Sequence, residues 1–353
     1  MNEELAIREQ SEELERMILS PNAVLSANSK GRLHPEEKCP VRTEFQRDRD
    51  RIVHCKAFRR LKHKTQVFID PEEDHFRTRL THTLEVSQIA RTIARALRLN
   101  EDLTEAISLG HDLGHTPFGH IGERVLNQMM AESIPGGRFK HSEQSLRVVD
   151  FLERDGRGLN LTAEVRDGIL HHSKGDADLS LDTRGPSTLE GRVVKISDRV
   201  AYINHDIDDA IRAGMIVQED IPRAAAKLLG ETHSDRISTM VGDIVRTSIE
   251  KNTIGMGEEV RKATNILKDF LYATVYGNAS GKQSELKHVE EIMRMLFQHY
   301  MSNPADMFEG RSEHETSIPE NIPERARMVC DFISCMTDRY AQRAYAKTFL
   351  PWL

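Results

Sequence analysis

The stretch that decides the fold is HDLGHTPFGHIGE, residues 111–123 of a chain of 353 residues. Before it, residues 101–113 carry apolar side chains at helical spacing. Within it, Thr116-Pro117 places a capping hydroxyl before a proline, a residue favoured at the first position of a helix. We therefore predict that one helix ends and the next begins inside this stretch, with Pro117 at the first helical position.

Helical patterns extend in both directions from this stretch. Upstream, apolar residues recur every three or four positions in THTLEVSQIARTIARALRL, residues 81–99. Downstream, GRVVKISDRVAYINHDIDDAIRAG, residues 191–214, carries an apolar stripe and reaches Gly214, which predicts a helix with a glycine cap. The composition agrees, because aromatic residues make up only 5% of the chain and charged residues 30%. The predicted fold class is all-α, without internal repeats.

We divide the chain into three predicted parts. Residues 1–47 form an N-terminal amphipathic helix and a polar arm, residues 48–215 form the core that carries the chemistry, and residues 216–353 form a C-terminal helical region packed on it. The clearest loops are Gly136-Gly137 and residues 173–190, the second being long enough for a lid or an insertion.

Composition also limits the possible partners and compartments. The formal net charge of −7 argues against a general nucleic-acid coat protein, so any phosphate site must be local. The cysteines show neither CxxC spacing nor a disulfide ladder, as in reduced cytosolic proteins; they are Cys39, Cys55, Cys330 and Cys335. The N-terminus lacks a signal-peptide pattern, and no apolar run approaches about 18 residues. We expect a cytoplasmic protein without a membrane segment.

Four residues form a candidate metal site: His82, His111, Asp112 and Asp198. Imidazole nitrogen and carboxylate oxygen are suitable ligands for divalent ions, and four ligands leave positions open for water and a substrate oxygen. Such a site is catalytic rather than structural. Each residue alone is unremarkable, and only tertiary folding can bring these three predicted helices together.

A candidate acid pair follows in the same stretch. His120 and Glu123 are neighbours on one helix face, so the carboxylate can orient the imidazole and raise its pKa. The N-terminus of that helix favours a bound phosphate. The competing interpretation of His111 and His115 as a zinc-protease HExxH pair is disfavoured, because Asp replaces Glu and Thr116-Pro117 interrupts the helix.

The helix predicted over residues 191–214 carries a second stripe beside its apolar one. Asp198, Tyr202 and Asp206 follow at helical spacing, with Arg199 beside them. This face suits a sugar phosphate, and the alternative is an exposed charged stripe that contains one tyrosine. For His171-His172, before the long loop, we expect local hydrogen bonds at a helix end, with the alternative that they line the cleft.

In order, these motifs resemble the deoxyguanosinetriphosphate triphosphohydrolases and related dNTPases of the HD superfamily. The matching segments are Arg79-Leu-Thr-His82, His111-Asp112 with His115, His120 and Glu123, Phe139-Lys-His141, and Asp198-Arg199 with Tyr202 and Asp206, together with residues 57–68, AFRRLKHKTQVF. The resemblance covers about residues 42–215. It implies an HD-domain helical core with an additional C-terminal helical region.

The resemblance also implies roles for individual residues. His82, His111, Asp112 and Asp198 would hold the metal, with Mg2+ or Mn2+ expected first and Co2+, Fe2+, Ni2+ or Zn2+ as alternatives. His120 and Glu123 would be the acid pair at the α-phosphate, and His115 and His141 would line the phosphate path. Arg79 and Arg199 would contact phosphate. Gln66, Tyr202 and Asp206 would surround the deoxyribose.

The implied reaction is attack of water on the α-phosphorus of a deoxynucleoside triphosphate, which releases deoxynucleoside and inorganic triphosphate. The implied assembly is a homo-oligomer, with a second nucleotide as a candidate regulator. Two alternatives stay open. One is an HD phosphohydrolase of another nucleotide, such as a monophosphate, a cyclic nucleotide or an alarmone. The other is a non-catalytic nucleotide or nucleic-acid-binding regulator, suggested by the basic residues 47–64.

Overall fold

The computed structural model describes residues 6–66, 76–173, 185–276, 283–308 and 318–350. Within these ranges the elements are helices, joined by turns and by two isolated β-bridges, Arg32 with Thr162 and Thr65 with Thr78. The prediction of an all-α fold is confirmed. None of the helices in these ranges combines the length and the apolar character that crossing a membrane requires.

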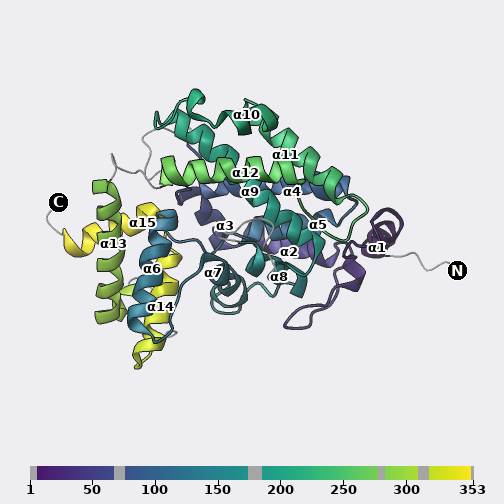
Figure 1. Ribbon diagram of the computed structural model, residues 1–353. Helices are drawn as coiled ribbons and strands as arrows, with labels where there is room; N and C mark the ends of the chain where they lie inside the picture. Colours follow the sequence, from purple (N-terminus) through teal and green to yellow (C-terminus); the bar gives the residue numbers. More distant parts are fainter. Residues whose placement is uncertain (1–5, 67–75, 174–184, 277–282, 309–317, 351–353) are drawn as a thin grey trace.

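Figure 1 shows the helices in sequence colours. The α-helices are α1 (Ile7–Ile18), α2 (Glu44–His54), α3 (Lys56–Arg60), α4 (Arg79–Ala96), α5 (Glu101–Gly110), α6 (Gly119–Ser133), α7 (His141–Arg147), α8 (Ala163–His171), α9 (Leu189–Arg212), α10 (Arg223–Leu229), α11 (His233–Ser248), α12 (Glu258–Leu271), α13 (Gln283–Ser302), α14 (Ile322–Ser334) and α15 (Asp338–Phe349). Short 3-10 segments are η1 (Ser26–Asn28), η2 (Leu61–His63), η4 (Gln218–Asp220) and η7 (Pro304–Phe308), and π-helical turns are η3 (Val148–Leu152) and η5 (Tyr272–Tyr276).

The main hydrophobic core surrounds α4, α5 and α9, which pack on one another at the centre of the molecule. The apolar stripes expected from the sequence are the buried faces of these helices, with Ile89 and Ile93 on α4 and Ile203 on α9. Glycine allows α8 to approach α5 closely, because a Cβ at Gly168 would lie 2.5 Å from the side chain of Ile107. Helices α10 to α12 cover α9 and belong to the same core.

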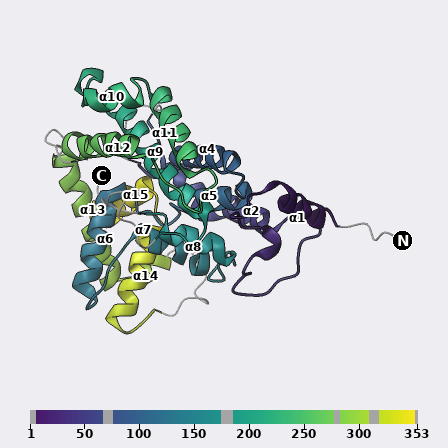
Figure 2. The same cartoon turned by 45° about the vertical axis from the view of Figure 1, so that its right-hand side comes forward.

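A second core joins α6 to the C-terminal helices α13, α14 and α15. Leu126 of α6, Leu296 of α13 and Ile333 of α14 are completely buried in it. Figures 1 and 2 both show α6, α13, α14 and α15 side by side, away from α10 and α11. Helix α6 therefore ties the end of the chain to the residues 111–123 stretch.

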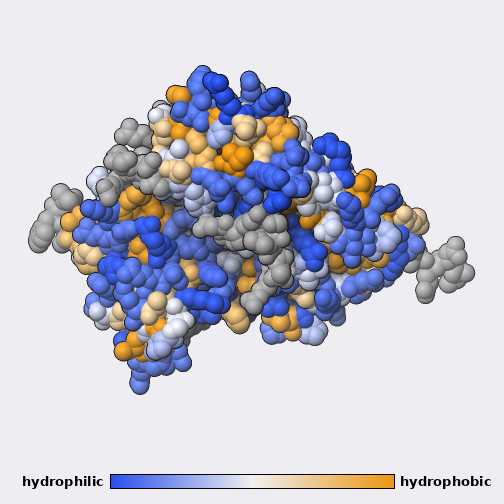
Figure 3. Space-filling view, in the orientation of Figure 1, coloured by the Kyte–Doolittle hydropathy of each residue, from blue (hydrophilic) through white to orange (hydrophobic). Residues whose placement is uncertain are grey.

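The described surface is mixed in character. On the face drawn in Figure 3, hydrophilic residues dominate around α6 and α14, while apolar residues gather nearer the top, where Figure 1 labels α10 to α12.

Most of the predicted loop of residues 173–190 lies outside the described residues, and α9 begins at Leu189 after a cap from Thr188.

The prediction that Pro117 takes the first helical position is wrong. Helix α5 ends at Gly110, and α6 begins only at Gly119, so Thr116-Pro117 lies in the turn between them. Phe118 adopts a left-handed conformation with φ of 59°, and its N–H donates to Asp338 at 3.0 Å. This contact comes from α15, at the far end of the sequence, and local capping rules could not include it.

Candidate active site

A cavity of about 450 Å3 opens beside the residues 111–123 stretch. Side chains from α4, α6, α9 and η5 line it, together with residues at the ends of η2, α5 and α8. All the sequence-predicted site residues except His111 and Glu123 lie on its surface, and those two pack directly behind it against Asp112 and His141. The tertiary structure therefore brings the predicted residues together.

The four candidate metal ligands converge from three helical segments. Nε2 of His82 lies 3.2 Å from Asp198 Oδ1 and 3.9 Å from Asp112 Oδ2. Nε2 of His111 lies 3.5 Å from Asp112 Oδ1. Ligand atoms of His82, His111 and Asp112 all lie within 4.8 Å of one another. Two imidazole nitrogens and the Asp112 carboxylate thus face one small volume, and Asp198 lies beside it through its contact with His82.

The protonation pattern of His111 fits a metal ligand. Its Nδ1 lies 2.6 Å from the carbonyl oxygen of Ser108, so Nδ1 carries the proton and donates it. Its Nε2 is buried and has no hydrogen-bond partner among the described residues. A free lone pair therefore points towards the carboxylate of Asp112, which is the arrangement that a divalent cation requires. The residues present fit such an ion.

The charges of the site keep its carboxylates ionised. Burial alone would raise the pKa of Asp112, but the neighbouring His111 and Arg79 outweigh it and hold the pKa well below its ordinary value. Arg79 Nη1 donates to Asp112 at 2.7 Å. Burial is likewise outweighed at Asp198, where the His82 contact lowers the pKa. Both groups are anionic near neutral pH.

The ion pair with Asp112 engages only one nitrogen of the Arg79 guanidinium, Nη1. Its side chain is 2% exposed and lines the cavity. Its Nη2 and Nε have no hydrogen-bond partner in the part of the chain that the structure describes. Buried guanidinium donors without partners are costly, and a ligand anion would satisfy them.

The predicted acid pair has a different geometry from the one expected. Glu123 Oε2 lies 3.7 Å from His120 Nδ1, whereas Glu123 Oε1 lies 2.9 Å from Nδ1 of His141 and also accepts the His141 backbone N–H at 2.8 Å. The His141 ring stacks on His115 with centroids 4.3 Å apart. His120 is 73% exposed. Glu123 therefore orients His141 most directly and lies next to the exposed imidazole of His120 at the cavity.

The pKa values in this group follow from burial and charge. Burial would raise the pKa of Glu123, but His141 and His120 hold it far below its ordinary value. Burial would lower the pKa of His141, and the charge of Glu123 raises it instead. At His115, burial and then Arg79 lower the pKa well below its usual range. His115 is consequently neutral beside a carboxylate–imidazole pair.

His172 is a site residue that the sequence analysis left out. The expected local bond exists, since Nδ1 lies 2.7 Å from the carbonyl oxygen of Ile169. The other edge of the ring lies in the cavity, with Nε2 3.2 Å from His141 Nε2. Burial, followed by His111 and His141, lowers the pKa of His172 to about 3. The only signal in the sequence was the His171-His172 doublet at the end of α8.

We call the histidines on and directly behind the cavity surface the histidine wall, formed by His82, His111, His115, His141 and His172. A second part of the lining, which we call the tyrosine wall, is formed by Tyr202 and Asp206 of α9 with Tyr272 and Tyr276 of η5. The hydroxyl of Tyr276 donates to Asp206 Oδ2. Burial and Asp206 raise the pKa of Tyr276 well above its ordinary value, so the phenol keeps its proton.

Further cavity residues complete the site. Gln66 and Arg199 lie on its surface, as the sequence predicted. Lys195 and the two tyrosines of η5 were missed. Lys195 could have been found, because it precedes Asp198 by about one turn on the same helix face. Tyr272 and Tyr276 could not, since nothing local relates η5 to α9.

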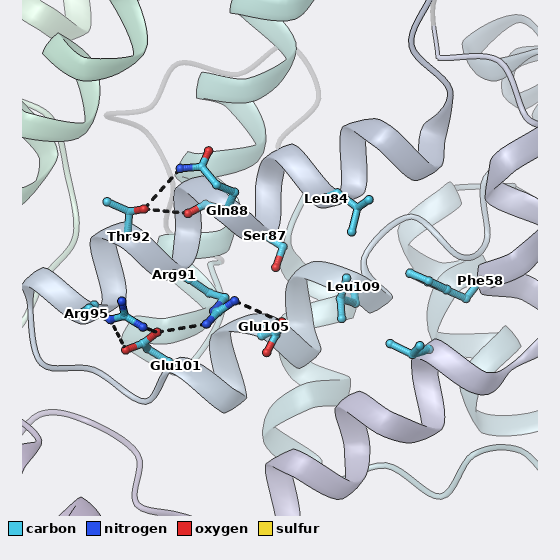
Figure 4. A pocket seen from close by; sticks show the side chains of 11 residues that line it. Phe58, Leu84, Ser87, Gln88, Arg91, Thr92, Arg95, Glu101, Glu105 and Leu109 are labelled. Atoms are coloured by element: carbon cyan, nitrogen blue, oxygen red, sulfur yellow. Dashed lines mark hydrogen bonds and ion pairs between the residues drawn. The ribbon is translucent and has the colours of Figure 1, made fainter. Parts of the chain in front are cut away.

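A second hollow, of about 520 Å3, lies between α2, α4 and α5 (Figure 4). Its charged end is closed by ion pairs of Arg91 and Arg95 with Glu101, and of Arg91 with Glu105. Its other end is apolar, with Leu84 and Phe58. It contains none of the converging histidines, so the candidate active site is the histidine-lined cavity.

Comparison with known proteins agrees with this geometry. The HD domain model matches residues 79–203, and the phosphohydrolase-associated domain model matches residues 254–347. Similar curated proteins are deoxyguanosinetriphosphate triphosphohydrolase-like proteins. That of Caldanaerobacter subterraneus subsp. tengcongensis is 55% identical over 98% of this chain and 97% of the relative. That of Desulfatibacillum aliphaticivorans is 51% identical over 98% and 99%.

A third relative, from Clostridium tetani, bears the same name and is 43% identical over 99% of this chain and 98% of its own. These identities extend over nearly the whole chain, far beyond the histidine motifs. The resemblance predicted from the motifs is thus confirmed, and the coarse activity is that of an HD-domain phosphohydrolase. The chain belongs to the HD-domain family of deoxyguanosinetriphosphate triphosphohydrolase-like proteins.

Proposed function

We propose that this protein hydrolyses deoxynucleoside triphosphates at the α-phosphorus and releases deoxynucleoside and inorganic triphosphate. The observation that carries the proposal is a cavity at which the four candidate metal ligands, three on its surface and His111 directly behind it, lie together with Arg79, Lys195 and Arg199 and the tyrosine wall. Three cations suit a polyphosphate better than a monophosphate, which needs fewer. The printed names of the relatives support the same substrate class.

The metal-binding residues would be His82, His111, Asp112 and Asp198, with Mn2+ or Mg2+ as the proposed ion. When bound, such an ion supplies Lewis-acid stabilisation of phosphate charge and lowers the pKa of water. The unpartnered Nη2 and Nε of Arg79 would donate to phosphate oxygens. Because Arg79 also holds Asp112, the same guanidinium would link the phosphate to a metal ligand.

Proton transfer would fall to the His120, Glu123 and His141 group. His120 is exposed at the cavity mouth and can donate a proton to the departing 5′-oxygen. Glu123 would orient His120 and hold positive charge on His141, since its carboxylate lies within 3.7 Å of both rings and raises the pKa of His141. His115 and His172 would line the phosphate path. Because both are neutral, they would not repel the metal ion or the Arg79 guanidinium.

The tyrosine wall would receive the deoxyribose. Tyr202 and Asp206 lie on the side of α9 that faces the cavity, and Gln66 lies on the same surface. A hydroxyl group of the sugar can bond the Asp206 carboxylate or Gln66, and close packing of Tyr202 can exclude a 2′-hydroxyl. A pocket discriminates most strongly against an analogue that leaves its buried polar groups unpaired.

The test is a product assay with dGTP, dATP, dCTP, dTTP and GTP, each with Mg2+, Mn2+ and Co2+, and with and without a second nucleotide. We expect tripolyphosphate as the only phosphate product from at least one deoxynucleotide, and little turnover of GTP. His111→Ala serves as the inactive control. Release of orthophosphate or pyrophosphate would contradict the proposal and favour another nucleotide substrate. No hydrolysis with any metal would favour a non-catalytic nucleotide-binding role.

A further inference from the structure

A buried histidine lies directly behind the candidate metal ligands. His205 is two turns after Asp198 on α9, and its side chain is fully buried. Its Nε2 lies 2.8 Å from Nδ1 of His82, and its Nδ1 lies 2.6 Å from Asp206 Oδ1. The other Asp206 oxygen accepts the hydroxyl of Tyr276. These four side chains form a continuous series from a metal ligand to the tyrosine wall.

Counting protons gives the series a direction. A neutral imidazole donates from one nitrogen and accepts at the other. Nε2 of His82 faces Asp198 and Asp112, so binding a cation there leaves the proton on Nδ1, which donates to His205. His205 then accepts at Nε2 and keeps its own proton on Nδ1, next to Asp206. This assignment pairs Nε2 of His205 with the Nδ1–H of His82 and leaves Nδ1 of His205 in ion-pair contact with Asp206, at a distance but not an angle typical of a hydrogen bond.

We propose that His205 is a positioning residue that presents Nε2 of His82 to the metal, and that Asp206 orients His205. The inference rests on the proposed function, because the metal held by His82 is the one that serves hydrolysis. Groups that hold a metal-binding histidine from behind commonly change metal affinity by about 10- to 100-fold when they are replaced. Asp206, expected from the sequence to contact only the sugar, thereby has a second role.

Packing alone does not account for this arrangement. A leucine could fill much of the volume of the His205 ring. It would leave Nδ1–H of His82 without an acceptor in a site where His82 is 2% exposed. The His82 ring would then gain by turning towards another partner, and Nε2 would leave its place between Asp112 and Asp198. Glutamine, in contrast, offers a carbonyl oxygen to His82 and an N–H to Asp206.

The experiment measures Mn2+ binding to the full-length protein by calorimetry, without nucleotide. We expect the Kd for Mn2+ to rise about 10- to 100-fold in His205→Leu and to stay within a few-fold of the parent in His205→Gln. His111→Ala identifies the binding event that belongs to this site. An unchanged Kd in His205→Leu would overturn the proposal, as would equal losses in the Leu and Gln variants.

Asn204→Ala is the matched control. Asn204 is the preceding residue on α9 and equally buried, but its side-chain oxygen accepts a hydrogen bond from Arg236 of α11. We expect it to lower Tm without changing the Mn2+ Kd. A loss of Mn2+ affinity in Asn204→Ala equal to that in His205→Leu would mean that general damage to α9 explains both, which would overturn the positioning role.

A second pair of variants tests the part played by Asp206. Asp206→Asn should weaken Mn2+ binding although Asp206 is not a metal ligand, whereas Tyr276→Phe should leave it unchanged. Equal Mn2+ affinity in Asp206→Asn and the parent would refute the Asp206 link. Because no substrate is present, these results are independent of the product assay. The positioning role could hold while the dNTP proposal fails, and the reverse.

Discussion

The two walls of the cavity are built from different chemistry. The histidine wall collects imidazoles with Asp112 and Glu123, and its buried charges are held by ion pairs with one another. The tyrosine wall has one buried carboxylate, Asp206, among phenols. A buried charge that loses its partner is costly, whereas an aromatic surface loses mainly contact area. We therefore expect the histidine wall to control whether the reaction occurs and the tyrosine wall to control which sugar is accepted.

The largest effect should follow from Asp198→Asn, which removes one of the candidate metal ligands beside the histidine wall. Metal catalysis is worth several kcal/mol, so we expect kcat to fall by about 10³-fold even at saturating Mn2+. Steady-state kinetics with a Tm measurement separates this effect from misfolding. If turnover were retained, the assignment of Asp198 as a metal ligand would be wrong.

The next largest effect should be that of His120→Ala. Loss of a general acid costs about 10²- to 10⁴-fold, and we expect kcat to fall while KM changes little. His171→Ala is the control, because this partly exposed histidine bonds Asp167 at 2.9 Å instead of the cavity residues. Full turnover in His120→Ala would remove this residue from the proposed mechanism.

At the tyrosine wall we expect a smaller effect, and on substrate binding instead of turnover. Tyr276→Phe removes the hydroxyl that bonds Asp206. A hydrogen bond contributes about 1 kcal/mol, so we expect KM for the deoxynucleotide to rise about fivefold with kcat nearly unchanged. Kinetics with dGTP and GTP measures both values. A loss of kcat as large as that of His120→Ala would show that turnover and sugar selection are not separate roles of the two walls.

The last effect concerns the support behind the histidine wall, and we expect it in stability and not in turnover. Lys64 is buried and donates to the carbonyl oxygens of His115 and Ser334, so it joins the wall to α14. Burial lowers the pKa of Lys64 to about 8 from 10.5. Between those pH values the unfolded chain binds more protons, so the free energy of unfolding should rise with pH.

Lys64→Met removes this dependence. We expect the parent to gain about 1–3 kcal/mol relative to the variant as the pH rises from about 8 to about 10.5, and to gain nothing below pH 8. Urea unfolding of both proteins at a series of pH values measures the difference. Parallel curves for the two proteins would show that Lys64 does not titrate in this range.

Most of the histidine wall was predictable because its residues are close in sequence or lie on strongly periodic helices. The spacing from His111 to Glu123 placed three histidines near one helix start, and the stripe of Asp198, Tyr202 and Asp206 followed from the helical period. The start of α6 was predicted two residues too early, because the contact of Asp338 with Phe118 is non-local. His172 was expected mainly to bond locally at a helix end, with a place in the cleft as the alternative, and its second edge does reach His141.

The sequence by itself determined that the chain is helical, which residues share a helix face, and which donors suit a divalent metal. These properties depend on periodicity and side-chain chemistry, both of which are local. Tertiary structure decided which faces meet. His205 and Asp206 are adjacent in the sequence, yet only the packing of α4 against α9 and of η5 against α9 places His82 on one side of this pair and Tyr276 on the other. Such contacts between distant segments depend on how whole helices pack, and no local pattern records them.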